Sequence, residues 1–264
     1  MSRGDVAVII PAWNEADRIT ATVQAAAKLA GADILVVVDD GSTDDTAALA
    51  AAAGAAVVRH ARNRGKAASM ETGAEAVRLI ERVDAEAAES GGARERHLLF
   101  LDADLADSAA DAGPLVDPVR AGAADMTIAI FATRIRKGGF GIVVATAGAG
   151  TDRAIGWRPV QPLNGMRCLT RGSFTAALPL APGWGAETGM TIDLARKGMR
   201  ITEVEVPLSH RATGNDWRAQ LHRLHQLVDV TRALLVREPA ALRLRSWPRT
   251  RLTRPTGGEG RGRQ

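Results

Sequence analysis

Apolar and polar positions follow two alternating patterns through the first hundred residues. Four short apolar runs, at 6–11, 34–38, 55–58 and 97–101, predict strands, and all but the run at 55–58 have the pattern of strands buried on both faces. Segments between them space their apolar residues as helices do, at 15–29, from the Thr43-Asp44-Asp45 cap to Gly54, and at 67–83. Alternation of strand and helix specifies a parallel sheet with right-handed crossovers.

The second half alternates less regularly. It predicts a helix at 109–120, a strand at 126–131, a mobile glycine-rich loop at 137–150 with a helix near 151–155, and a strand at 164–170. A helix at 187–197, a half-exposed strand at 201–206 and an amphipathic helix at 217–236 complete the pattern. One face of the last helix is predicted to carry Leu221, Leu224, Leu227 with Val228, Thr231, and Leu234 with Leu235. The chain is therefore expected to be an α/β protein, with a mostly parallel sheet flanked by helices and a C-terminal amphipathic helix.

Charge divides the chain unevenly. The formal net charge is +4, but residues 1–238 hold 27 Lys and Arg against 29 Asp and Glu, so the excess of positive charge belongs to 239–264. We expect one domain over 1–238 and a basic, disordered tail over 239–264. An aromatic content of 3% with no Tyr disfavours stacking on single-stranded nucleic acid, and no nucleic-acid partner is expected.

Location is inferred from what the sequence lacks. No apolar run approaches the ~20 residues of a membrane-spanning helix, and the first residues do not have the pattern of a signal peptide. The single cysteine, Cys168, cannot form an internal disulfide and is expected to be a small buried residue. We therefore expect a cytoplasmic protein.

Polar clusters end the predicted strands. They are Asn14 with Glu15, Asp39 with Asp40, 64–66, and Asp102 with Asp104. Parallel strands bring their carboxyl ends to one edge of the sheet, so these groups can share one crevice. Carboxylates there can bind ribose or base, Lys66 can neutralise phosphate, and the Asp pair suits Mg²⁺ or Mn²⁺ bridging a diphosphate.

These segments also resemble a known family. The stretches at 8–15, 36–46, 63–73 and 99–104 resemble, in order and spacing, the motifs of GT-A-fold glycosyltransferases of family 2, a Rossmann-like fold. The resemblance implies a hexosyltransferase with a nucleotide-sugar donor, favours a UDP-sugar, and implies Mg²⁺ or Mn²⁺ as cofactor. It makes 1–105 the nucleotide-binding half and 106–238 the acceptor-binding half. It places the donor against Pro11, Ala12, Glu15, Asp40, Lys66, Asp102 and Ala103, with Asp102 on the ribose or the metal and Asp104 as the main metal ligand.

The second half is similar to the glucosyl-3-phosphoglycerate synthase group at 183–194 and 207–211. By that resemblance Glu187 borders the acceptor, His210 is a metal ligand and Arg211 contacts phosphate. Glu187 could be the catalytic base of an inverting enzyme or could orient an acceptor hydroxyl in a retaining one. A small acceptor such as 3-phosphoglycerate is implied. Arg134 could grip an acidic acceptor or belong to a solvated charge cluster.

Other readings stay open at this point. His222 and His225 could form a metal pair, although solvent-facing His is commoner, and His60 and His97 are expected at the surface. The last helix and the Arg-rich tail would also suit a polyprenyl-phosphate sugar transferase, in peripheral contact with the inner face of the membrane. A third reading is a non-catalytic binding protein that uses the basic tail. A homodimer is compatible with the sequence.

Overall fold

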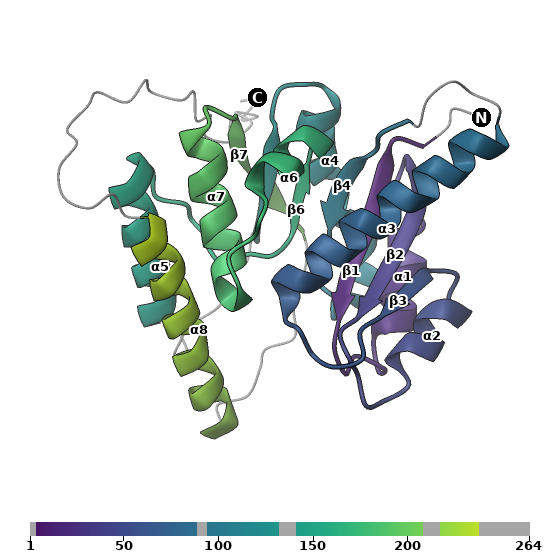
Figure 1. The fold of residues 1–264 in the computed structure, drawn as a ribbon, viewed down its shortest axis with the longest axis horizontal. Coiled ribbons are helices and arrows are strands. Elements are labelled where there is room, and N and C mark those ends of the chain that lie inside the picture. The colour runs from purple at the N-terminus through teal and green to yellow at the C-terminus, as the bar shows by residue number, and fades with distance from the viewer. Residues whose placement is uncertain (1–3, 89–93, 132–140, 208–216, 238–264) are drawn as a thin grey trace, which may run out of the picture.

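The computed structural model describes residues 4–88, 94–131, 141–207 and 217–237; the side chains of 141–142 and 217–225 are left out of this description. A seven-stranded sheet in the order β3-β2-β1-β4-β6-β5-β7 forms the centre (Figure 1). The strands are β1 (Val6–Ala12), β2 (Ala32–Asp39), β3 (Ala56–Arg59), β4 (His97–Phe100), β5 (Met126–Phe131), β6 (Arg167–Leu169) and β7 (Ile201–Val206). All pairings are parallel except those of β6, which runs antiparallel to both β4 and β5. The expected α/β fold with a mostly parallel sheet is confirmed.

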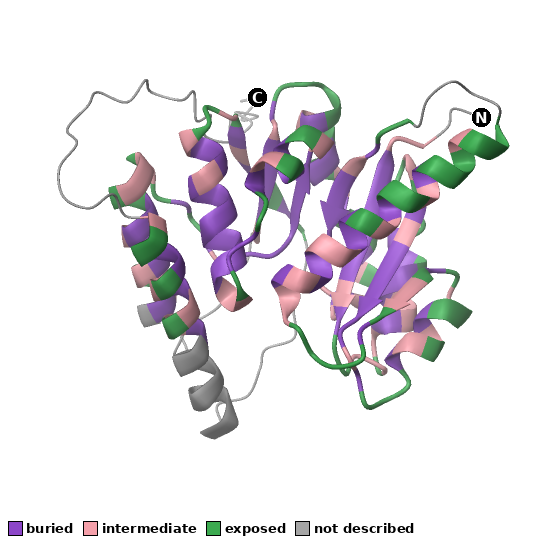
Figure 2. Cartoon of the chain, in the orientation of Figure 1, coloured by how far each residue is buried: buried purple, intermediate pink, exposed green. Residues whose placement is uncertain are grey.

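Helices cover both faces of the sheet. One face packs against α1 (Ile19–Ala26), α2 (Thr46–Ala52), the 3-10 helix η1 (Ala106–Ala112) and α4 (Gly113–Arg120). The other packs against α3 (Lys66–Ala87), α6 (Arg171–Ala177) and α7 (Ala186–Arg196), which follows the short 3-10 helix η2 (Gly183–Gly185). The inner strands of the sheet are mostly buried, whereas the edge strand β3 and the outer side of α3 are partly exposed (Figure 2).

A third layer lies against α7. It consists of α5 (Gly141–Ile155) and α8 (Trp217–Arg237), whose apolar side chains form a small core with Ile192 of α7. Figure 1 shows α5 and α8 side by side, beyond α7 from the sheet. None of the described helices combines the length and apolar character needed to cross a bilayer.

Most predicted elements are confirmed, with changes at their ends. α1 begins at Ile19, because the backbone N–H groups of 14–16 donate instead to side chains that follow β2. The helix predicted at 109–120 divides into η1 and α4 at Gly113. The prediction of a loop up to Gly150 is wrong over 141–150, which belongs to α5. Small residues let this segment pack closely against α8, since a Cβ on Gly150 would lie 2.4 Å from Leu234 Cδ1.

The buried face of α8 differs from the predicted one. Leu227 and Leu234 do pack inward, but the side chains that fill the interface beside them are Val230 and Ala233. Val228 and Leu235 are exposed, so the prediction that they belong to the apolar face is wrong. The helix is rotated because it approaches glycine positions of η2 and α7, where a Cβ on Gly185 would lie 2.7 Å from Ala233 Cβ. Leu221, Leu224, His222 and His225 have no described side chains.

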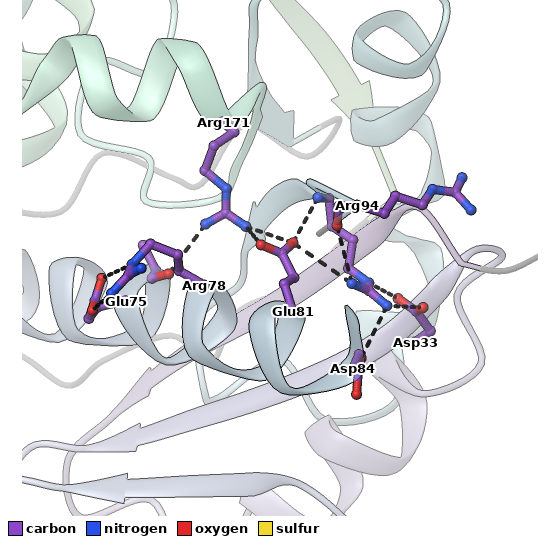
Figure 3. A network of polar contacts seen from close by, with 9 residues as sticks. Asp33, Glu75, Arg78, Glu81, Asp84, Arg94 and Arg171 are labelled. Atoms are coloured by element: carbon purple, nitrogen blue, oxygen red, sulfur yellow. Dashed lines mark hydrogen bonds and ion pairs between the residues drawn. The ribbon is translucent and has the colours of Figure 1, made fainter. Parts of the chain in front are cut away.

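A buried polar network joins α3, α6 and the segment before β4. Glu81 is 3% exposed and accepts two 2.8 Å hydrogen bonds from Nη2 of Arg171. It also accepts from the backbone N–H of Arg96, whose guanidinium binds Asp33. Figure 3 shows Arg171 and Asp33 meeting this network from opposite sides. The network ties the amino end of the sheet to its covering helices.

Candidate active site

The loops after β1 and β2 are joined by hydrogen bonds from backbone N–H groups to side chains. Asn14 N donates to Ser42 Oγ over 2.9 Å, and Glu15 N donates to Thr46 Oγ1 over 2.8 Å. Asn14 adopts φ of 55° to make this turn, a conformation that Asn tolerates better than most residues. The predicted meeting of strand-end clusters is therefore present at β1 and β2.

Asp40 holds the turn that leads into α3. Its Oδ1 lies 2.6 Å from His60 Nδ1 and accepts from Arg64 N over 2.8 Å, while Oδ2 accepts from Gly65 N over 2.7 Å. The prediction that His60 is a surface residue is wrong, because it is buried between Asp40 and Thr72 of α3. His97 is half-buried at the start of β4. The Asp40 carboxylate thus fixes the backbone turn that directly precedes Lys66.

Lys66 joins the two halves of the site. Its Nζ lies 2.6 Å from Asp102 Oδ1, after β4, and 3.4 Å from Glu187 Oε1, on the first turn of α7. Burial alone would lower the pKa of Lys66, but the Asp102 and Glu187 carboxylates outweigh it and hold the pKa above its ordinary range. Gly165 makes the approach feasible, since a Cβ there would lie 1.9 Å from Nζ.

Acidic groups gather on the other side of Asp102. The pKa of Glu15 is raised to about 7, mainly by burial and then by the negative charges of Asp104, Asp44 and Asp102, against the opposing effect of Arg18. Arg18 also donates to the backbone oxygen of Asp104 over 3.1 Å. Carboxylates that repel one another in this way favour a cation between them, and their hard oxygens suit Mg²⁺ or Mn²⁺.

Several predicted site residues lie outside the described residues. These are the metal ligand His210 and the acceptor residues Arg211 and Arg134. In the described part of the chain, no three His, Cys, Asp or Glu side chains are grouped closely enough to hold a metal. The basic tail, 239–264, is likewise outside the description.

The remaining predicted residues lie around this edge. Pro11 and Ala12 end β1, with Ala12 O accepting from Asp40 N over 2.8 Å. Ala103 is buried, and its backbone oxygen accepts from Thr22 Oγ1 over 2.8 Å. The site thus combines strand ends from the first half with the start of α7 from the second.

Sequence reasoning missed Gly165 and Arg167. Arg167 is completely buried on β6, next to Glu187. An arginine inside the strand predicted at 164–170 was the signal that could have found it, because arginine is almost never fully buried without a partner. Gly165 gave a weaker signal, as one glycine among 27.

Comparisons with known proteins identify the class of enzyme. The family model described as "Glycosyl transferase family 2" matches residues 7–79. A crystal structure of glucosyl-3-phosphoglycerate synthase from Mycobacterium tuberculosis with Mg²⁺ and UDP superposes with a TM-score of 0.66 at 28% identity, covering 89% of this chain and 79% of that chain. The chain is a glycosyltransferase with a GT-A-like fold, and its residues 7–79 match family 2.

This glycosyltransferase is also similar in structure to an enzyme crystallised with a metal, a donor and a second ligand. It is the same Mycobacterium tuberculosis enzyme with Mn²⁺, UDP-glucose and phosphoglyceric acid, with a TM-score of 0.64 at 26% identity, covering 89% of this chain and 80% of that chain. Among curated proteins no match was found. The matched family segment runs from β1 into α3, so it includes the Asp40–His60 contact and Lys66 but ends before Asp102.

Proposed function

We propose that this glycosyltransferase moves a sugar from a UDP-sugar to a small phosphorylated acceptor such as 3-phosphoglycerate, with Mg²⁺ or Mn²⁺ as cofactor. The observation that carries the proposal is the bridge made by Lys66, from Asp102 in the donor half to Glu187 in the acceptor half. The ligands named for the similar Mycobacterium tuberculosis structures support the same choice of donor, metal and acceptor.

The donor is assigned to the strand-end side of Lys66. Pro11, Ala12 and Glu15 are assigned to the base and ribose, together with the buried Ala103, which separates the two aspartates in the sequence. Asp40 acts mainly through the 64–65 turn, which it holds with two backbone hydrogen bonds. Asp102 meets the ribose or the metal.

The metal is assigned to Asp104, with His210 as a further ligand. When bound, the ion would neutralise charge on the diphosphate as it leaves. The repulsion among Glu15, Asp104 and Asp102 supports a cation at this place. Lys66 contributes a second positive charge beside the diphosphate, and its raised pKa keeps it protonated at neutral pH.

The acceptor is assigned to the α7 side of Lys66. The Glu187 carboxylate is 1% exposed, and neither of its oxygens accepts a hydrogen bond from the described residues. It is therefore able to accept one from an acceptor hydroxyl, either to orient that hydroxyl or to take its proton. Arg211 and Arg134 are proposed to bind the acceptor's anionic group.

Calorimetry with sugar nucleotides tests the donor. UDP-glucose, GDP-mannose and related compounds would each be titrated with Mn²⁺ present, and again with EDTA. We expect UDP compounds to bind only with Mn²⁺, and Asp104→Ala to lose that binding. Equal binding in EDTA would contradict the metal dependence of donor binding. If no sugar nucleotide bound, the assignment of a sugar-nucleotide donor would be contradicted.

The acceptor is tested by transfer from the donor so identified. 3-Phosphoglycerate, glycerate and inorganic phosphate would be offered in parallel, with release of the nucleoside diphosphate as the readout. Preference for 3-phosphoglycerate over glycerate would support a phosphate-binding acceptor site. Equal turnover of both would leave the transferase assignment intact and contradict the phosphorylated acceptor.

A further inference from the structure

Arg167 is placed where an arginine is energetically unfavourable. It begins β6, opposite Phe100 of β4 and Ile128 of β5, and its side chain is completely buried. Its guanidinium lies beside the sulfur atoms of Met126 and Met190, each 3.9 Å from Nη1. A buried charge in such surroundings usually costs more than an apolar residue of similar size would. Its presence therefore calls for a role other than packing.

The guanidinium joins the two segments that enclose Lys66. Nη2 donates to Asn164 O over 2.7 Å, next to Gly165, whose backbone lies against Lys66. Nη1 donates to Glu187 O over 3.1 Å and to Thr191 Oγ1 over 3.3 Å, which are both on the first turns of α7. Thr191 Oγ1 itself donates to Glu187 O over 2.8 Å. One side chain thus fixes the backbone on either side of the proposed reaction centre.

The positive charge of Arg167 also interacts with the Glu187 carboxylate. All hydrogen bonds of Arg167 within the described residues go to neutral groups, and Nε has none. Burial lowers the pKa of Arg167 to about 10, with Glu187 and Asp102 opposing the decrease, so it is protonated at neutral pH. Glu187 has no hydrogen-bond partner there, and its ion-pair partner is Lys66. Lys66 is shared with Asp102, and Arg167 adds a second positive charge that interacts with Glu187.

We infer that Arg167 is a positioning residue of the transferase, which fixes the first turn of α7 and so directs the Glu187 carboxylate toward Lys66 and the acceptor hydroxyl. The inference rests on the proposed function, since that assigns Glu187 to the acceptor. It adds a residue that acts through Glu187 and touches neither substrate.

The test compares R167M, R167K and R171M. Methionine fills a similar volume between Met126 and Met190 without the charge, whereas lysine keeps the charge and part of the hydrogen bonding. R171M is the matched control, because Arg171 is also a mostly buried arginine but binds Glu81 at the other end of the sheet. With UDP-glucose and 3-phosphoglycerate, we expect R167M to lower kcat about 10- to 100-fold, a cost typical of a misplaced catalytic group. UDP affinity with Mn²⁺ should stay within about threefold, since the donor side of Lys66 is unchanged.

R167K is expected to recover part of the lost kcat, and R171M to keep wild-type kcat despite a lower melting temperature. Amide hydrogen exchange at 186–191 is the readout that needs no activity. This exchange should be faster in R167M than in the wild type and in R171M. Each protein would be measured the same number of degrees below its own melting temperature.

Wild-type exchange at 186–191 in R167M, or a kcat equal to that of R171M, would overturn the inference. If R167M does not fold, R167K decides: an intermediate kcat supports the inference, and wild-type kcat with wild-type exchange overturns it. Failure of the wild-type chain to bind UDP would instead remove the proposed function, while the exchange result would still decide whether Arg167 fixes α7.

Discussion

Lys66 Nζ lies 2.6 Å from Asp102 Oδ1, although the two residues are 36 positions apart in the sequence. The contact places the first residue of α3 against the loop after β4. At the proposed donor site, the diphosphate and its metal would meet this existing ion pair. Binding must therefore redistribute three charges, those of Lys66, Asp102 and the ligand.

Removing the Lys66 charge should weaken donor binding. In Lys66→Met, Asp102 and Glu187 lose their cation, and the diphosphate meets uncompensated carboxylates. We expect UDP affinity with Mn²⁺, measured by calorimetry, to fall about 10- to 100-fold, which is typical for loss of a partly buried charge contact. Lys28→Met, on an exposed position after α1, is the control and should leave affinity unchanged. An affinity in K66M within threefold of the wild type would contradict the assigned role.

Adding one methyl group at Gly165 should have a similar effect without removing any charge. The new Cβ would lie 1.9 Å from Lys66 Nζ and 3.0 Å from Asp102 Oδ1, so the lysine must move away. Gly165→Ala is expected to lower UDP affinity about tenfold by calorimetry. Gly172→Ala on α6, where no atom lies within 4 Å of the new Cβ, is the matched control. It should keep wild-type affinity and be slightly more stable, because alanine favours helix. Equal affinities for the two variants would show that the lysine has room to adjust.

Stability without metal should depend on pH through Glu15. The pKa of Glu15 is about 7 in the folded chain, raised from 4.5, so the folded state binds more protons between these values. The stabilising effect of its protonation is fully present below about pH 4.5 and is lost as pH rises through about 7. Chemical unfolding in EDTA should show this decrease in the wild type, and Glu15→Gln should flatten it. A wild-type decrease that persists unchanged in E15Q would assign the effect to other groups.

The Glu81 network should support stability but not donor binding. Arg171→Met leaves the buried Glu81 carboxylate without the guanidinium that binds both its oxygens, although Arg96 remains nearby. We expect a loss of about 2–4 kcal/mol in the free energy of unfolding. In a chain of this length that loss lowers the melting temperature by roughly 5–10 °C. UDP affinity at 25 °C should be unchanged. A large loss of affinity would mean that the amino end of the sheet is coupled to the site.

The first half of the fold could be predicted because its signals are local. Continuous apolar runs identified β1 to β4, and the polar residues after them identified the edge where Lys66 and Asp102 meet. The partners of these residues could not be found in the same way. His60 was assigned to the surface because nothing nearby in the sequence shows that α3 returns over it with Thr72.

The second half was harder because its pattern depends on tertiary contacts. The segment 141–150 is rich in glycine and alanine, which predicts a loop, yet it is helical because α8 packs closely against it. The buried side of α8 is likewise set by Gly185 and Ala233 and not by its most apolar stripe. Arg167 was missed since β6 has only three residues, too few for any periodicity.

The antiparallel strand β6 determines how this enzyme could be recombined with its relatives. β4 and β5 do not pair with each other; each pairs with β6, which is supplied by residues far along the chain. A chimera joined at residue 105 would therefore combine the β4 of one parent with the β6 of the other, in the middle of one hydrogen-bonded sheet. Donor and acceptor specificities are then not interchangeable modules, and a swap that preserves the fold must carry β4 and β6 together.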